Sequence, residues 1–100
     1  MKHMIRASIA DKGIATWWNG EPDEIVLAGE GEATDGVLVS EEDGCWCIYE
    51  CKGYDVLDEI ASFEEFYDAV SESEKYMKHL GYKVDEKSLD RAMRRAGLIY

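Results

Sequence analysis

The first half of the chain alternates apolar and polar positions, which is the pattern of strands with one buried face. Ile5, Ala7 and Ile9 recur at every second position, and the segment 45–52 has the strongest strand pattern in the chain. Clusters of Gly, Asn, Asp and Pro between such segments are typical of turns. We therefore predict a meander of about four or five antiparallel strands over residues 4–57.

The second half of the chain changes to the period of amphipathic helices. Apolar side chains follow helical spacing, and Ser62 with Glu65 forms a capping-box pattern at the start of the first helical stretch. We predict helices over residues 62–80 and 85–96, packed on one face of the sheet. Strands followed by helices indicate an α+β fold, and the length fits a single domain, residues 1–100.

The acidic residues are concentrated in the middle of the chain. The sequence has 22 Asp and Glu against 11 Lys and Arg, a net charge of −11. The segment 13–74 holds 18 acids and one base, whereas 75–100 holds seven bases and three acids. Net charge alone favours solubility, for which a magnitude of about 2–8 suffices in a small domain. A field this negative repels nucleic acids and anionic membranes, so it favours a positively charged protein partner.

Carboxylates also recur at helical spacing within the first predicted helix. Glu64, Asp68 and Glu72 are four residues apart, about 6 Å per step along a helix. Such like-charge spacing destabilises an isolated helix, which suggests that a partner uses it. The candidate partner-binding residues are Glu64, Glu65, Asp68 and Glu72 of this helix, Glu41, Glu42 and Asp43 of a predicted hairpin loop, Glu30 and Glu32 of a loosely alternating segment, 24–34, and Trp18.

Trp17 and Trp18 are adjacent in a predicted strand, so their side chains point to opposite faces. One of them is expected in the core and the other on the surface, and the sequence leaves open which is exposed. An exposed tryptophan beside an acidic surface suits a binding anchor, and it equally suits the cover of a sheet edge. Trp18 is therefore included among the candidate residues.

Cys45, Cys47 and Cys51 share one face of a predicted strand. This extended spacing favours three reduced, buried thiols over a disulfide or a zinc site, whose ligands usually lie in tight turns. The only histidines are His3 and His79, and no motif pairs either of them with a nucleophile. We therefore predict no enzymatic activity, no metal and no cofactor.

No apolar run is long enough for a membrane span, and the N-terminal residues lack the apolar stretch of a signal peptide. A cluster of three cysteines without an even count fits a reducing compartment. We therefore expect a cytoplasmic protein.

Closely spaced carboxylates can occupy a groove that normally binds phosphates. The leading hypothesis is a small acidic inhibitor, a nucleic-acid mimic that binds a basic nucleic-acid-handling protein. Phage counter-defence proteins, anti-CRISPR proteins among them, behave in this way as a class, although no motif assigns the chain to one family. One alternative is an immunity protein that neutralises a basic nuclease toxin. A second alternative is a nucleic-acid-binding module that uses the helix with Arg91, Arg94 and Arg95 in a helix-turn-helix arrangement.

Overall fold

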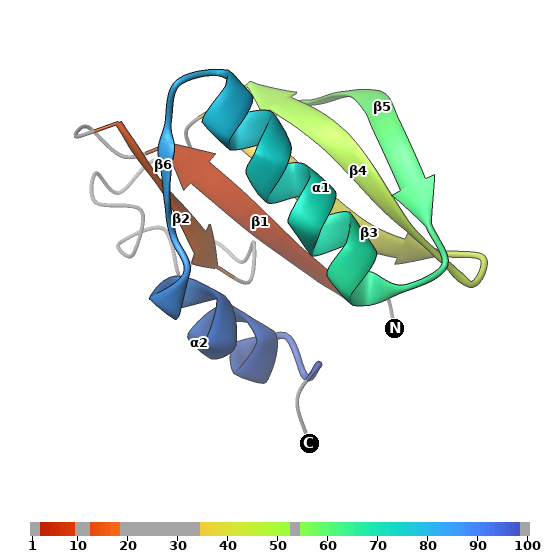
Figure 1. The fold of residues 1–100 in the computed structure, drawn as a ribbon. Helices are drawn as coiled ribbons and strands as arrows, with labels where there is room; N and C mark the ends of the chain where they lie inside the picture. The colour runs from red at the N-terminus through yellow and green to blue at the C-terminus, as the bar shows by residue number, and fades with distance from the viewer. Residues whose placement is uncertain (1–2, 10–12, 19–34, 53–54, 99–100) are drawn as a thin grey trace.

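A computed structural model describes residues 3–9, 13–18, 35–52 and 55–98. Within these ranges, a six-stranded sheet is followed by two C-terminal helices packed on it, which confirms the predicted α+β fold (Figure 1). The predicted strand pattern at 24–34 lies outside the described residues. The elements are β1 (Met4–Ile9), β2 (Ile14–Trp18), β3 (Gly36–Glu42), β4 (Cys45–Lys52), β5 (Asp55–Phe63), α1 (Phe66–His79), β6 (Lys83–Asp85) and α2 (Lys87–Arg95).

The strand order is β5-β4-β3-β1-β2-β6, so the sheet departs from a simple meander. β3 returns to pair with β1, with Ala7 opposite Val37, and this places β1 in the middle of the sheet. The neighbours are antiparallel except for β6, which pairs in parallel with β2. β6 is only three residues long, which is too short to show an alternating pattern in the sequence. It forms because the chain returns to the edge of β2 after α1.

The sheet extends to Phe63, and the first helix begins at Phe66 rather than at residue 62 as predicted. Ser62 pairs with Cys47 across the strands, and Phe63 pairs with Trp46. The predicted capping box is therefore wrong: Ser62 belongs to β5, and the N-cap residue Glu65 makes no side-chain capping bond. Cross-strand pairing with β4 outweighs the local capping signal at this position.

The second helix begins at Lys87, two residues later than predicted. Asp85 stays in β6, and its carboxylate accepts a hydrogen bond from the backbone N–H of Lys87 at 3.2 Å. Because β6 separates the two helices, the short turn of a helix-turn-helix motif is replaced by a strand (Figure 1). Neither helix within the described ranges is long and apolar enough to cross a membrane.

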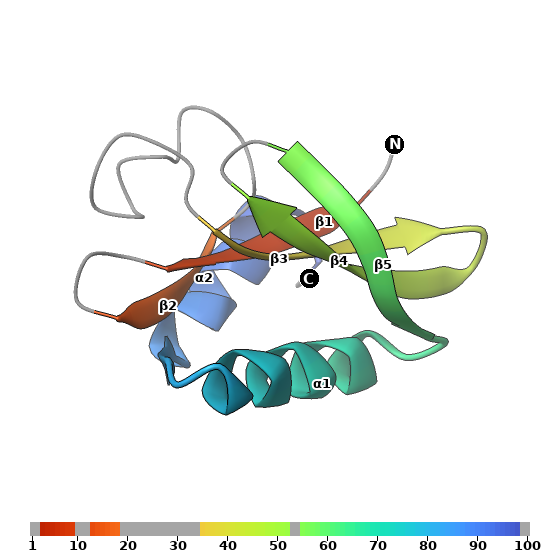
Figure 2. The same cartoon turned by 90° about the horizontal axis from the view of Figure 1, so that it is seen from above.

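Figure 2 shows α1 lying against one side of the sheet, and the main core lies between them. Trp17, Val39 and Ile48 come from three strands and are at most 1% exposed. Met77 of α1 and Ala92 of α2 join the same cluster, so both helices contribute to one core. This confirms that the two helices pack on the sheet and complete its apolar face.

Trp17 and Trp18 are both buried, at 1% and 2% exposure, so the prediction that one of them is exposed is wrong. The two side chains do point to opposite faces, as the strand alternation requires. Trp18 lies on the face away from α1, where its indole N–H donates to the Ser8 hydroxyl at 2.8 Å. The guanidinium of Arg6 lies 5.7 Å from the centroid of its ring. Trp18 therefore packs inside the protein and offers no anchor to a partner.

Candidate functional site

The β3–β4 hairpin and the connection between β5 and α1 lie at the same end of the sheet (Figure 1). Glu41 pairs with Trp46, and Trp46 pairs with Phe63, so the three residues form one row across β3, β4 and β5. Two interstrand steps separate the backbones of Glu41 and Phe63 by about 10 Å. Glu64 and Glu65 follow Phe63 directly, so the acids of the hairpin, 41–43, and those that precede α1 are brought together.

A buried aromatic contact holds this arrangement in place. The ring of Trp46 meets the ring of Phe66 edge to face, with 4.7 Å between their centroids and 68° between their planes. Trp46 is only 8% exposed. Because Trp46 lies close to the turn of the hairpin and Phe66 begins α1, this contact fixes the first turn of the helix against the turn end of the hairpin.

We call six carboxylates of this region the acidic end: Glu41, Glu42, Asp43, Glu64, Glu65 and Asp68. They fall into two groups according to their internal contacts. Glu41 and Glu42 are half-buried: the carboxylate of Glu41 lies 3.4 Å from the imidazole of His3, and that of Glu42 accepts a hydrogen bond from the Tyr49 hydroxyl. The exposed group is Asp43, Glu64, Glu65 and Asp68. These four are the predicted residues best placed to meet a partner.

The turn of the hairpin carries Asp43 outward. Asp43 and Gly44 have φ angles of 51° and 83°, the left-handed conformation that a two-residue Asp-Gly hairpin turn requires. Beside the turn, the hydroxyl of Tyr49 donates to Glu42, and this bond together with burial raises the pKa of Tyr49. The bond ties the Glu42 carboxylate to β4, so Asp43 is the exposed acid at the tip.

The predicted row of Glu64, Asp68 and Glu72 does not form on one helix. Glu64 precedes α1, and only Asp68 and Glu72 keep the helical spacing of four residues. Glu72 is half-buried beside Lys75 on the lining of a groove between α1 and β5. Glu74, one of the 18 acids of the segment 13–74, accepts a hydrogen bond from the indole N–H of Trp17 at 3.1 Å.

Tyr67 is a surface residue that the sequence pattern missed. Its spacing from Phe63 and Val70 predicts a place on the apolar side of the helix, yet it is 65% exposed. Its ring contacts Phe66 edge to face, with 5.4 Å between the centroids. One residue corresponds to about 100° of rotation around a helix, so Tyr67 turns away when Phe66 and Val70 face the core. An exposed aromatic ring close to Asp68 suits contact with Lys or Arg.

The basic helix lies elsewhere. Lys87, Arg91, Arg94 and Arg95 are exposed on α2, beside β2, and Figures 1 and 2 both place α2 apart from the hairpin. Arg94 pairs with Asp90 of the same helix at 3.0 Å. The cations of α2 are therefore not positioned to neutralise the acidic end.

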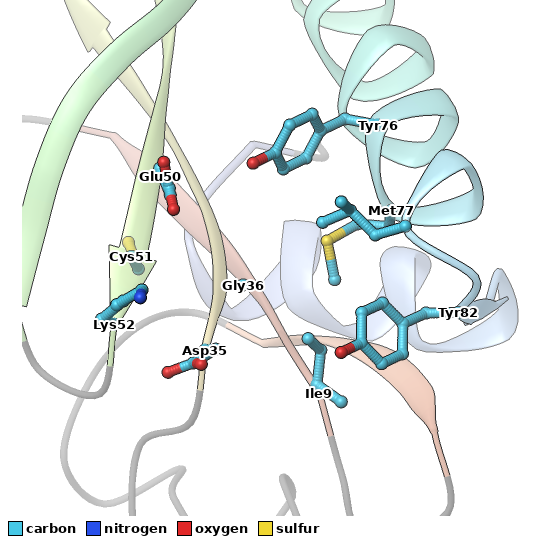
Figure 3. A pocket seen from close by; sticks show the side chains of 10 residues that line it. Ile9, Asp35, Gly36, Glu50, Cys51, Lys52, Tyr76, Met77 and Tyr82 are labelled. Atoms are coloured by element: carbon cyan, nitrogen blue, oxygen red, sulfur yellow. The ribbon is translucent and has the colours of Figure 1, made fainter.

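A small hollow opens beside the other end of α1, between the helix and the strands (Figure 3). Tyr76, Met77 and Tyr82 project into it from the helix side, and Glu50 lies on its strand side. Burial, with a contribution from Glu50, raises the pKa of Tyr76. The volume of about 100 Å³ is below the range of about 300–1,000 Å³ in which small molecules bind.

The three cysteines share one face of β4, as predicted, and are free thiols. This face points away from α1. Cys47 and Cys51 are buried, and Cys45 is half-exposed. Burial, followed by the nearby carboxylate of Glu59, raises the pKa of Cys47 to about 11. Across the described ranges, no three His, Cys, Asp or Glu side chains are grouped to hold a metal ion.

We expect Cys47 to react slowly with iodoacetamide in the folded protein. With a pKa of about 11, about one thousandth of this thiol is ionised at pH 8, and only the thiolate reacts. Because the pKa is raised, the rate should increase about tenfold per pH unit between pH 8 and 10. Mass spectrometry of the peptide that contains Cys47 measures the rate, with the protein unfolded in urea as control. Equal rates in the folded and unfolded protein would contradict this assignment.

Glu30 and Glu32 lie outside the described residues, so the structure does not place them. Comparisons with protein-family models, with curated proteins and with solved structures found no match to this chain. The candidate site is therefore defined by geometry alone: it is the acidic end, formed by the β3–β4 hairpin and the start of α1, with Tyr67 beside it.

Proposed function

We propose that this protein is a small acidic inhibitor that binds a basic nucleic-acid-handling protein through the acidic end. The main support is the meeting of the hairpin acids with those that precede α1, held by the contact between Trp46 and Phe66. Asp43, Glu64 and Asp68 are exposed there. Such an inhibitor acts in the cytoplasm, where its target handles nucleic acid.

Electrostatics supports a protein target in preference to nucleic acid. The net charge of −11 repels a phosphate backbone and attracts a basic groove over a long range. Lys and Arg side chains that neutralise phosphates would meet carboxylates instead, which steers association and excludes the nucleic acid. The alternative of a nucleic-acid-binding module with a helix-turn-helix arrangement has less support, because β6 separates α1 from the arginine-bearing α2.

Charge reversal at the acidic end tests this proposal. In the variant, Glu64→Lys is combined with Asp68→Lys; the control combines Glu86→Lys with Asp90→Lys. Both pairs change the net charge equally. The side chains of Glu86, the N-cap residue of α2, and of Asp90 in α2 are 69% and 64% exposed, and α2 lies apart from the hairpin (Figures 1 and 2). The acidic-end variant should bind its partner at least about tenfold more weakly, mostly through slower association, whereas the control should stay within about twofold.

The measurement is capture from the source cell at low salt, with wild type, variant and control as baits. We expect wild type and control to retain a basic nucleic-acid-binding protein that double-stranded DNA or RNA displaces and that the variant loses. Matching melting temperatures would show that all three baits are folded. The proposal is rejected if no basic protein is captured at low salt, or if the variant captures it as well as wild type. Capture of a nuclease toxin would identify the immunity role, which uses the same surface.

A further inference from the structure

β5 forms one edge of the sheet, and in the described part of the chain it pairs only with β4. All its residues from Asp55 to Ile60 are exposed. Among them, Val56, Leu57 and Ile60 are large aliphatic residues at 49%, 43% and 38% exposure. An edge strand presents backbone N–H and C=O groups outward, and exposed aliphatic side chains along it favour the addition of another strand.

A groove of about 380 Å³ lies between β5 and α1. Ile48, Ile60 and Tyr76 contribute apolar surface to its lining, which Glu72, Lys75 and His79 complete. Ile60 therefore belongs both to the exposed edge and to the groove. A strand added along β5 would direct every second side chain toward the face on which this groove opens.

The charges along β5 determine which strand can be added. Asp55, Asp58 and Glu59 are exposed, and β5 contains no Lys or Arg. A second copy of the chain would bring the same carboxylates against them, and like charges on neighbouring strands are destabilising. The net charge of −11 on each copy adds to this repulsion. A segment that carries Lys or Arg meets the same carboxylates with attraction.

The pairing of β5 with β4 is regular over only part of the strand. The register of this pairing shifts twice, at the β4 residues Ile48 to Tyr49 and again at Tyr49 to Cys51. The regular part of β5 therefore runs from Ala61 to Phe63, next to Ile60 and the groove. Glu64 follows at its end, so a segment that runs along this part of β5 leads directly to the acidic end.

We propose that β5 accepts, by strand addition, an extended segment of the basic partner in which apolar and basic residues alternate. The apolar side chains enter the groove beside Ile60, and the basic side chains meet the carboxylates of β5. This inference rests on the proposed function, because it takes the partner to be a basic protein. It adds that recognition includes backbone pairing, with the acidic end as the neighbouring charged contact.

A nine-residue peptide of alternating arginine and valine, measured by isothermal titration calorimetry, tests the proposal on the full chain. Two modified peptides carry N-methyl groups on one or the other alternate set of amides, which removes donors without changing charge. We expect one methylated set to raise Kd at least about tenfold and the other to leave it unchanged. The double variant Asp58→Lys with Glu59→Lys, which reverses the two exposed acids next to Ile60, should also raise Kd at least about tenfold. The α2 control, Glu86→Lys with Asp90→Lys, should change Kd no more than about twofold.

Three results would overturn the proposal. If neither methylated set weakens binding, the peptide is held by charge and not as a strand. If the β5 and α2 double variants weaken binding equally, only the net charge matters. If the wild type sediments as a dimer that Ile60→Lys separates, the occupant of β5 is a second copy. The peptide measurement needs no natural partner, so failure here leaves capture through the acidic end intact, and a failed capture leaves the peptide result intact.

Discussion

Gly36→Ala is expected to destabilise the fold by about 3 kcal/mol or more, enough to remove much of the stability of a small domain. A Cβ atom at Gly36 would lie 1.9 Å from the carbonyl oxygen of Ala7 and 2.9 Å from its carbonyl carbon. Both are backbone atoms, so no side chain can move aside. Gly36 is paired with Ser8 on one side and Cys51 on the other, so relief requires β1 and β3 to separate inside the sheet.

Gly13→Ala is the matched control. Gly13 has a φ of +72°, and a Cβ there would meet nothing within 4 Å. Its substitution carries only the strain of a left-handed conformation, about 1 kcal/mol. Urea unfolding followed by circular dichroism measures both variants. If Gly36→Ala loses no more stability than Gly13→Ala, the backbone of Ala7 does not approach Gly36 this closely.

Trp17→Ala is expected to cost about 3–5 kcal/mol, the range for removal of a large buried aromatic side chain. Trp17 is 1% exposed and connects three elements. Its indole N–H donates to Glu74 of α1 at 3.1 Å, and its backbone N–H donates to the Ser88 hydroxyl of α2 at 2.8 Å. Loss of the ring therefore leaves a cavity where both helices meet β2, and the Glu74 carboxylate loses its donor.

Trp17→Phe separates the two contributions, because it keeps an aromatic ring and removes the indole N–H. We expect it to cost about 1–2 kcal/mol, less than the effect of alanine. Glu74→Gln keeps an oxygen that can accept the indole bond, and it should change stability by less than about 1 kcal/mol. Urea midpoints of the three variants measure these differences. A loss below about 1 kcal/mol for Trp17→Ala would show that this ring is not central to the core.

Much of the architecture follows from local patterning. The alternation of Ile5, Ala7 and the segment 45–52 predicts strands, and the structure contains strands there, although β1 is buried on both faces. The helical period after residue 62 also produced helices, because buried positions such as Val70 and Met77 repeat at 3.6 residues. The ends of these elements differ from the prediction, because pairing with β4 places Ser62 and Phe63 in β5.

The candidate site shows the same division. The exposed acids Asp43, Glu64, Glu65 and Asp68 were identifiable from charge alone, because exposed carboxylates need no special context. That the hairpin acids lie beside Glu64 could not be read from the sequence, since about 20 residues separate them and only the register of β3, β4 and β5 brings them together. Trp18 was misplaced because alternation gives the face of a strand, whereas burial depends on what covers that face.

The sequence by itself determined the fold class, the concentration of negative charge, and the common face of Cys45, Cys47 and Cys51, because periodicity and formal charge are properties of nearby residues. Only the tertiary structure decided the central place of β1, the pairing of β6 with β2, and the free edge of β5 beside a groove. Each of these depends on contacts between segments far apart in the chain. Which of these contacts form depends on which apolar surfaces pack together in the core, and the pattern of neighbouring residues does not specify this.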